Sequence, residues 1–438
     1  MRGGLSAAPL MAPEPPTSDF GMFGRRLNGP AGAPVAVALS GGGDSLALLH
    51  LAKAWADRAG RRLVALTVDH GLQPASAAWT GFAAERALSL GVAHRALAWT
   101  GHKPAHGLPA AARAARHALL AEAARTAGAR VLLMGHTADD LVEAEEMRRM
   151  GAAVPSPRFW SPSPAWPEGR GVFLLRPLLE RRRADLRRLL QGLGESWIED
   201  PANDDLRFAR AVARRRLAGQ AVVPPPPLDP APWPGLAEVR CGPGGELVLA
   251  RGRLAGPGGD DVARAMGALA VCAAGGRKTP SAVQLARLRA RLASPGDFVA
   301  ALAGARIEAR GEQLLFCREA GEHRRIGLAT APLPRGESVF DGRFLVVAGA
   351  TGWRIAPLRG LASRLSRPAR ARLAELPAPV RAALPAAISP AGEVVCPVLD
   401  DAGPVAAHSL TRQRLCATLG AFADEAALWR VANLPSAT

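Results

Sequence analysis

The amino-terminal half of the chain alternates short apolar runs with longer segments in which apolar residues recur at helical spacing. Three runs stand out, at residues 34–39, 63–68 and 131–134, and each ends at a cluster of glycine and polar residues. Short apolar runs bounded by turn residues are typical of buried strands, and the Ala/Arg-rich segment 110–127 has the periodicity of a helix. The pattern predicts an α/β fold, with a parallel sheet covered by helices on both faces in a Rossmann-like arrangement.

Proline-rich stretches interrupt this alternation and suggest where the domains end. Residues 151–171 are rich in Pro, Ser and Trp, and we expect an irregular loop there. Two basic helices are expected after it, at residues 181–190 and 205–217. The domains predicted in this way are a disordered tail (1–24), a catalytic domain (25–220), a stiff Pro-rich linker (221–234) and a smaller mixed α+β region that recognises the substrate (235–438).

The chain is strongly basic, with 55 Lys and Arg residues against 38 Asp and Glu residues and a formal net charge of +17 at pH 7. Binding of a basic protein to phosphates releases counterions, which makes the binding more favourable, so a nucleic-acid partner is favoured. A GC-rich coding sequence could explain the preference for arginine over lysine, but it would not explain the excess over acidic residues.

Cysteine usage and hydropathy bear on the compartment. The five cysteines are scattered and none belongs to a C-x-x-C pair, which favours a reducing compartment and disfavours an iron–sulfur or zinc site. The first residues lack the apolar segment of a signal peptide, and arginines interrupt even the Ala-rich stretches, so no run is long enough to span a membrane. We expect a cytoplasmic protein.

The segment Ser40–Ser45 carries the clearest chemical signal. It follows the first predicted strand and opens the first predicted helix, where glycine N–H groups and the helix N-terminus can hold a phosphate. No lysine follows the glycines, so this is not the loop of ordinary P-loop NTPases. The alternative is a Gly-rich turn capped by serine. The residues expected around such a phosphate-bearing ligand are Ser40, Gly41, Gly42, Gly43, Asp44 and Ser45, with Asp69, His70, Gly135 and His136 at two further strand ends.

The loop SGGGDS matches the SGGxDS signature of the PP-loop ATP pyrophosphatases, which transfer AMP. Several further segments resemble the tRNA(Ile)-lysidine synthase family within that superfamily, in matching order from about Val35 to Leu217. These segments are residues 68–72 (VDHGL), 111–116 (AARAAR), 135–143 (GHTADDLVE), 176–179 (RPLL) and 197–204 (WIEDPAND). The chain departs from the family pattern at Leu141, Ala144, Ala211 and Val212.

The resemblance implies an ATP-dependent, carbon–nitrogen bond-forming ligase. In that reaction ATP adenylates the C2 oxygen of the wobble cytidine in an isoleucine tRNA with a CAU anticodon. The ε-amine of free lysine then displaces AMP to form lysidine. The implied cofactors are ATP and Mg²⁺, and the implied partners are tRNA and L-lysine, without a membrane.

Four residues are candidates for catalysis. Asp44 is expected to hold Mg²⁺, because a hard cation prefers carboxylate oxygens, although it could merely cap a helix. Arg113, which shares a helical face with Arg116, is expected to stabilise charge on the α-phosphate or the nucleotide backbone. The alternative for these two arginines is an ordinary solvated basic face. Asp140 and Glu143 share a helical face and could bind the lysine ammonium and accept its proton. The alternative for this pair is a surface salt bridge with Arg148 or Arg149.

Arginine clusters flank the predicted turn at residues 199–204 and could bind the tRNA backbone. Residues 183 and 187 share one helical face, as do 210 and 214. The alternative is that these arginines pair with the neighbouring acidic residues, which they outnumber. The residues assigned to tRNA are Arg116, Arg183, Arg187, Arg210, Arg214 and Arg215.

Three other functions are compatible with parts of this sequence pattern. A tRNA thiolation enzyme of the same superfamily would commonly need cysteines near the nucleotide, but none precedes Cys241. A non-catalytic RNA-binding relative is suggested by the departures from the family pattern. Amidation of a small molecule would leave the excess positive charge unexplained.

Overall fold

The computed structural model describes residues 21–152, 154–201, 205–220, 223–226, 229, 231–256, 259–400 and 403–432. The expected tail lies outside this part except for residues 21–24, which form the short helix α1 (Gly21–Gly24). They differ from the expected disorder because Phe23 is buried and stacks on Trp55, with ring centroids 5.8 Å apart. Parts of the predicted linker, and Ala202, Asn203 and Asp204 of the predicted turn, also lie outside the described residues.

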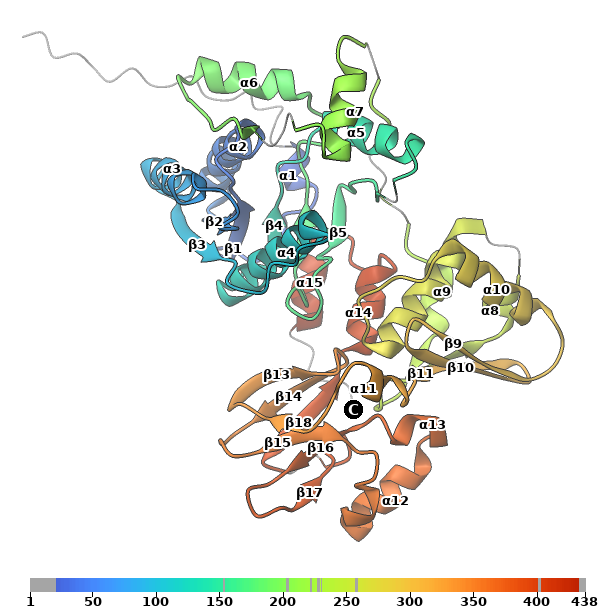
Figure 1. The fold of residues 1–438 in the computed structure, drawn as a ribbon. Helices are drawn as coiled ribbons and strands as arrows, with labels where there is room; N and C mark the ends of the chain where they lie inside the picture. Colours follow the sequence, from blue (N-terminus) through green and yellow to red (C-terminus); the bar gives the residue numbers. More distant parts are fainter. Residues whose placement is uncertain are drawn as a thin grey trace, which may run out of the picture. The chain divides into compact units, whose positions relative to one another are not determined.

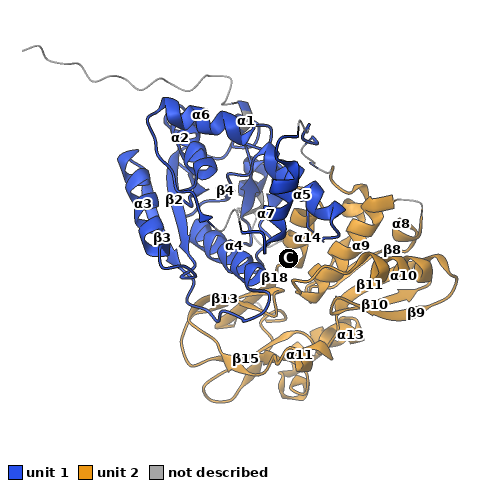
Figure 2. Cartoon of the chain, turned by 45° about the horizontal axis from the view of Figure 1, so that its top comes forward, with its two compact units in different colours: residues 1–230, 423–434 blue, residues 231–422, 435–438 orange. Residues whose placement is uncertain are grey.

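The chain divides into two compact units (Figures 1 and 2). Unit 1 comprises residues 1–230 with 423–434, and unit 2 comprises residues 231–422 with 435–438. No helix within the described ranges combines the length and the apolar character needed to cross a membrane.

Unit 1 contains a six-stranded sheet in the order β3-β2-β1-β4-β6-β5. Every neighbouring pair is parallel except β5 and β6. Its strands are β1 (Pro34–Ala38), β2 (Arg62–Asp69), β3 (Ala93–Ala98), β4 (Val131–Leu133), β5 (Trp160–Pro162) and β6 (Phe173–Leu175). The three strands predicted from apolar runs are therefore confirmed, and so is the parallel α/β class.

Helices cover both faces of this sheet because its strands are apolar on both sides. Ala36, Leu66 and Leu132 face α4 in one apolar cluster, whereas Val35 and Val37, which alternate with Ala36, are buried on the opposite face. The helices of the unit are α2 (Gly43–Ala59), α3 (Ser76–Ser89), α4 (Leu108–Thr126), α5 (Ala138–Arg149), α6 (Arg183–Gly192), α7 (Ala209–Leu217) and α15 (Glu425–Ala432).

The Pro/Trp-rich segment 151–171 is not wholly irregular, so that expectation was wrong in part. Residues 160–162 form β5, which pairs with β6 at the edge of the sheet. An edge strand tolerates Pro162 because one side of its backbone needs no partner strand. Trp160 is buried and stacks on Phe173, with ring centroids 4.9 Å apart.

Unit 2 combines helices with three separate sheets, in agreement with the mixed composition predicted for this region. The sheets have the orders β7-β8-β11-β10-β9, β12-β15-β16-β17 and β13-β14-β18, and all of their pairs are antiparallel. Its strands are β7 (Arg240–Cys241), β8 (Leu247–Ala250), β9 (Phe298–Leu302), β10 (Ala305–Arg310), β11 (Gln313–Arg318), β12 (Ala331–Pro332), β13 (Gly336–Phe340), β14 (Phe344–Ala348), β15 (Arg354–Pro357), β16 (Pro385–Ile388), β17 (Val394–Val395) and β18 (Val405–Ser409). Its helices are η3 (Pro234–Glu238), α8 (Gly252–Ala255), α9 (Gly259–Ala274), α10 (Ala282–Ala293), α11 (Glu322–Arg325), η4 (Ala362–Arg364), α12 (Arg367–Glu375), α13 (Ala378–Arg381) and α14 (Thr411–Thr418).

The carboxyl-terminal helix α15 belongs to unit 1 and not to the region that precedes it in sequence. Its first residue, Glu425, is fully buried and forms an ion pair with Arg61. The backbone N–H of Gly29 also donates a hydrogen bond to the Glu425 carboxylate, at 3.0 Å. Within the described residues the chain therefore passes from unit 1 to unit 2 and back again, which the linear division of the sequence did not anticipate.

Candidate active site

The predicted phosphate loop joins β1 to α2 and is held by its own serines. The hydroxyl of Ser45 accepts a hydrogen bond from the backbone N–H of Ser40 at 3.1 Å and donates one to the carbonyl of Gly42 at 2.9 Å. Because these contacts fix the curve of the loop without a ligand, its backbone N–H groups are organised for an anion before one arrives.

Two glycines allow other segments to approach this loop closely. Gly41 has φ +81°, and a Cβ there would lie 2.5 Å from Cδ1 of Ile198. At the end of β4, a Cβ on Gly135 would lie 3.1 Å from the carbonyl oxygen of Asp44. Any side chain at either position would push the loop out of place.

Asp69 and His70, at the end of β2, are held by local contacts. The carboxylate of Asp69 accepts hydrogen bonds from the hydroxyl of Ser76 and from the backbone N–H of Gly71, which lower its pKa. His70 lies edge-on to Trp99, and burial together with the charge of Arg116 lowers its pKa. Asp69 therefore stabilises the turn, while His70 is neutral at pH 7 and lies near Arg116.

His136, at the end of β4, is a hydrogen-bond acceptor. Its Nδ1 accepts a hydrogen bond of 3.1 Å from Nε of Arg176. Burial and the charge of Arg176 hold the pKa of His136 well below its ordinary value, so the ring is neutral. Arg176 also donates to the carbonyl of Arg158 and the hydroxyl of Ser161, so it is fixed on three sides.

Arg113 and Arg116 lie one turn apart on α4, and neither side chain makes an ion pair or a hydrogen bond with a residue in the described part of the chain. Burial and the charge of Arg210 lower the pKa of Arg113, and the charge of Asp140 opposes that change. Burial and the charges of Arg113 and Arg210 lower the pKa of Arg116 to about 10, which still leaves it protonated at pH 7. His117 beside them is buried, and neither ring nitrogen has a partner within the described ranges. This group suits an external anion.

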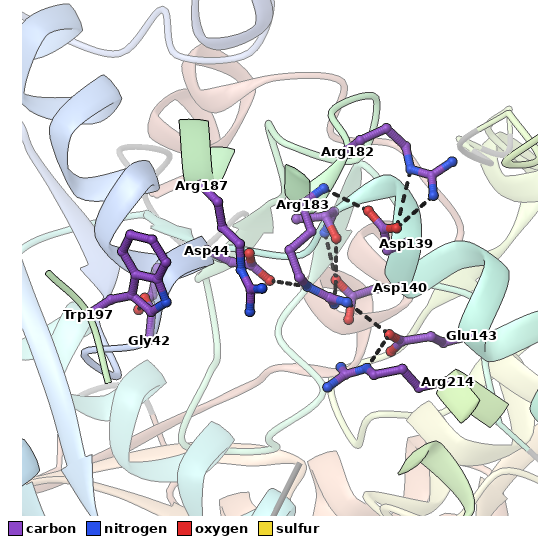
Figure 3. A network of polar contacts seen from close by, with 12 residues as sticks. Gly42, Asp44, Asp139, Asp140, Glu143, Arg182, Arg183, Arg187, Trp197 and Arg214 are labelled. Atoms are coloured by element: carbon purple, nitrogen blue, oxygen red, sulfur yellow. Dashed lines mark hydrogen bonds and ion pairs between the residues drawn. The ribbon is translucent and has the colours of Figure 1, made fainter. Parts of the chain in front are cut away.

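Asp44 extends from the first turn of α2 and meets Arg183 of α6 (Figure 3). Nε of Arg183 donates to Oδ2 of Asp44 at 3.0 Å. Burial raises the pKa of Asp44, while the guanidinium of Arg183 opposes the rise. Its position in the loop's first helical turn is consistent with the expected role beside a triphosphate.

Asp140 and Glu143, on the inner face of α5, are both buried. Asp140 closes a capping box, because its Oδ2 accepts hydrogen bonds from the backbone N–H and the hydroxyl of Thr137, at 2.7 and 3.0 Å. The salt bridges with Arg148 or Arg149 that sequence allowed do not form here: Arg149 pairs instead with Glu145.

Three arginines surround this carboxylate pair, and Figure 3 shows two of them, Arg183 and Arg214. Nη1 of Arg183 and Nε of Arg214 donate to Oε1 of Glu143 at 3.1 and 2.9 Å. Nε of Arg210 donates to Oε2 of Glu143 at 3.0 Å, and its Nη2 donates to Asp140 at 2.8 Å. Burial opposes ionisation of Glu143, but these arginines hold its pKa below the ordinary value. Residues assigned separately to tRNA and to lysine thus meet at one point.

Arg187 and Arg215, which were also assigned to tRNA, are exposed. Arg187 pairs with Glu199, its Nη2 lying 3.2 Å from Oε1, and its guanidinium lies over the ring of Trp197. Arg215 is exposed and has no ion pair or hydrogen bond among the described residues. The pairing of arginines with local acids that the sequence allowed does occur at Arg188 with Asp185.

Two residues that organise this site were not predicted from the sequence. Asp139 accepts hydrogen bonds from the backbone N–H of Arg183 at 2.7 Å and from Nη2 of Arg182 at 2.9 Å, which fixes the start of α6. Arg176 positions His136, as described above. Both residues stood in the motifs quoted for the resemblance, but nothing in their spacing showed what they would contact.

Three of the departures from the family pattern lie at packing positions. Leu141, Ala144 and Ala211 are all buried, on α5 and α7, which pack against each other. Arg210 and Arg214 of α7 still donate hydrogen bonds to Asp140 and Glu143 beside these three residues.

A six-stranded α/β sheet with an SGGGDS loop between β1 and α2 defines a PP-loop ATP-binding domain, and the family model described as "PP-loop domain" matches residues 24–221. The chain is 51% identical over 350 residues to the tRNA(Ile)-lysidine synthase of Caulobacter vibrioides, covering 80% of this chain and 82% of that protein. It is 40% identical to the enzyme of the same name from Hyphomonas neptunium, covering 69% of this chain and 83% of that protein. The chain belongs to the tRNA(Ile)-lysidine synthase family.

A solved structure, the U34-tRNA thiolase NcsA from Methanococcus maripaludis, is a distant likeness. It is 17% identical with a TM-score of 0.39, over 45% of this chain and 71% of that one. No conclusion about substrate or chemistry follows from it.

Proposed function

We propose that this protein is a tRNA(Ile)-lysidine synthase that performs the reaction for which its family is named. The C2 oxygen of the wobble cytidine attacks the α-phosphate of ATP, which breaks the bond to the β-phosphate and releases pyrophosphate. The ε-amine of lysine then attacks C2, forms the carbon–nitrogen bond and displaces AMP, and the amine gives up a proton. A tRNA substrate and scattered, unpaired cysteines support a cytoplasmic location.

One observation carries the assignment of the subsites. Arg183 donates hydrogen bonds to Asp44 and to Glu143 at the same time. Asp44 belongs to the phosphate loop and Glu143 to the proposed lysine subsite, so a single guanidinium spans the two. The lysine amine would therefore lie close to the α-phosphate, which is joined to the C2 oxygen after the first step, and so close to the C2 atom that the amine attacks in the second step.

We assign the nucleotide subsite to the Ser40–Ser45 loop together with Arg113 and Arg116 of α4. The loop would hold the pyrophosphate portion through backbone N–H groups. Arg113 and Arg116, whose side chains make no ion pair or hydrogen bond in the described part of the chain, would stabilise the charge that develops on the α-phosphate. The neutral rings of His70 and His136 line this region without adding charge.

Mg²⁺ fits this site only together with the nucleotide. The described residues contain no group of three or more acidic, His or Cys side chains able to hold a metal ion. Mg²⁺ is commonly bound through one or two carboxylates together with phosphate oxygens, which Asp44 and ATP could provide. When bound there, the ion would neutralise phosphate charge.

Asp140 and Glu143 would hold the lysine ammonium, and one of the two would take the proton that the attacking amine loses. Glu143 is ionised at neutral pH, because Arg214, Arg183 and Arg210 hold its pKa below the ordinary value. An ionised carboxylate is the acceptor that an ammonium requires.

The activity is tested by following AMP and pyrophosphate release from ATP by the purified full chain. The proposal expects turnover only when both lysine and tRNA with a CAU anticodon are present. A protein that binds this tRNA but releases no AMP under any condition would be a non-catalytic relative. Release that depends on a sulfur donor in place of lysine would indicate a thiolation enzyme.

A further inference from the structure

The proposed lysine subsite is already filled by side chains of the protein itself. Glu143 accepts hydrogen bonds from three guanidinium groups, two on Oε1 and one on Oε2. Its side chain is only 3% exposed, so few approaches to its oxygens remain. An ammonium and a guanidinium are both cationic N–H donors that seek the same oxygens. Lysine therefore cannot reach Glu143 unless at least one arginine leaves.

We propose that Arg210 and Arg214 occupy the lysine subsite in the free enzyme and are withdrawn by the phosphates of bound tRNA, so that lysine binding depends on tRNA. This inference rests on the proposed function, because it takes Asp140 and Glu143 as the lysine-binding residues. It adds that two arginines of α7 make the binding of the two substrates interdependent.

Exposure distinguishes these two arginines from the third. The side chains of Arg210 and Arg214 are 43% and 34% exposed, so phosphates can reach them although their N–H groups point at carboxylates. Arg183 is 19% exposed and is held at both ends, by Asp44 through its side chain and by Asp139 through its backbone N–H. It is suited to stay in place when the other two move.

The helix that carries Arg210 and Arg214 is also equipped to meet a polyanion. Arg215 and Arg216 follow on α7, and both are exposed. Phosphate oxygens can accept bidentate hydrogen bonds from a guanidinium, as carboxylates do. Phosphates of the tRNA backbone can thus replace Glu143 and Asp140 as the acceptors for these two arginines. The buried carboxylates then need another cation, because a buried charge without a partner is unfavourable.

Withdrawal of these arginines would also prepare the carboxylate for chemistry. Arg214 and Arg210 are among the causes that hold the pKa of Glu143 low, whereas its burial acts to raise it. When the two guanidinium groups leave, Glu143 becomes a stronger base beside the lysine amine. Lysine that arrives before tRNA would meet neither an open subsite nor an effective base.

The experiment measures binding of radiolabelled L-lysine to the full chain by equilibrium dialysis, with and without saturating tRNA(Ile) transcript and without ATP, so that no turnover occurs. Breaking one charge-assisted hydrogen bond costs about 1.5–3 kcal/mol, which corresponds to about ten-fold or more in affinity. We expect tRNA to increase the affinity for lysine by at least that factor. Arg210→Gln and Arg214→Gln should each raise the affinity for lysine without tRNA and reduce the effect of tRNA.

Arg149→Gln is the matched control. It removes one charge from α5, the helix that carries Glu143, but Arg149 pairs with Glu145 and contacts neither carboxylate of the lysine subsite. Its lysine affinity should therefore stay at the wild-type value both without tRNA and at saturating tRNA. The inference is overturned if tRNA leaves the wild-type affinity for lysine unchanged, or if Arg149→Gln acts like the other two variants. Failure of the proposed function looks different: lysine would then bind equally well to Glu143→Gln and to the wild type in the tRNA complex.

Discussion

Nη2 of Arg61 lies 2.7 Å from Oε1 of Glu425, and both side chains are buried although 364 positions separate them in the chain. Arg61 precedes β2 and Glu425 begins α15, so this ion pair fastens the carboxyl-terminal helix to unit 1. A buried ion pair that loses one partner leaves an uncompensated charge, which is far more costly than the loss of an exposed pair.

We therefore expect Glu425→Ala to lower the free energy of unfolding of unit 1 by about 3–5 kcal/mol, measured by denaturant titration of the full chain. Asp57→Ala is the control, because its ion pair with Lys53 is exposed and should contribute less than about 1 kcal/mol. Equal effects of the two substitutions would show that Glu425 has no special structural role.

The phosphate loop depends on the missing side chain of Gly41. In Gly41→Ala the new Cβ would collide with Ile198 and strain a backbone with φ +81°, so ATP binding should be lost or severely weakened. Gly60→Ala provides the control, since Gly60 has φ +60° but no atom within 4 Å of the new Cβ. It should cost about 1–2 kcal/mol of stability and leave ATP affinity unchanged, as measured by calorimetric titration.

Asp44→Ala should abolish AMP formation in the presence of tRNA and lysine while far-ultraviolet circular dichroism shows an intact fold. The expected reason is loss of the carboxylate that we assign to Mg²⁺ beside the phosphates. Asp185→Ala removes an acid from α6 that pairs with the exposed Arg188, and it should retain activity. Normal turnover by Asp44→Ala would remove Asp44 from the mechanism.

Asp140→Asn and Glu143→Gln should raise the KM for lysine far more than the KM for ATP. Each substitution removes a charge-assisted hydrogen bond to the ammonium, which corresponds to about ten-fold or more in affinity. Glu145→Gln changes an acid of the same helix that pairs with the exposed Arg149, and its kinetics should match the wild type. If lysine dependence is unchanged in both site variants, the carboxylates serve only to hold α6 and α7.

Binding of tRNA should weaken steeply as salt concentration rises, because the phosphate contacts release counterions. Removing the charge of Arg210, Arg214 or Arg215 should each flatten the plot of log K against log salt by roughly one unit. Arg62→Gln is a suitable control, since Arg62 is exposed at the opposite, amino end of the sheet. If Arg62→Gln changed the slope of log K against log salt as much as removal of the Arg215 charge, tRNA binding would not be localised to α7.

Much of unit 1 could be predicted because its signals are local. Residues 34–39, 63–68 and 131–134 are apolar enough to be buried on both faces of a sheet, and each ends in residues that favour turns. The edge strand β5 was missed because its three residues lie among prolines and gain their regular structure only by pairing with β6. Helix α6 begins two residues later than expected, where the carboxylate of Asp139 accepts from the backbone N–H of Arg183.

The sequence by itself determined the strand, the glycine loop and the helix that form the phosphate site, because contiguous residues there supply the apolar surface, the conformational freedom and the hydroxyl contacts. It also predicted which acids and arginines carry the chemistry. Only the tertiary structure decided that Arg210 and Arg214 donate to Glu143, that Arg176 donates to His136 and that Glu425 pairs with Arg61. These partners are distant in sequence, so packing of the elements that carry them sets their distances, and residue order alone does not fix that packing.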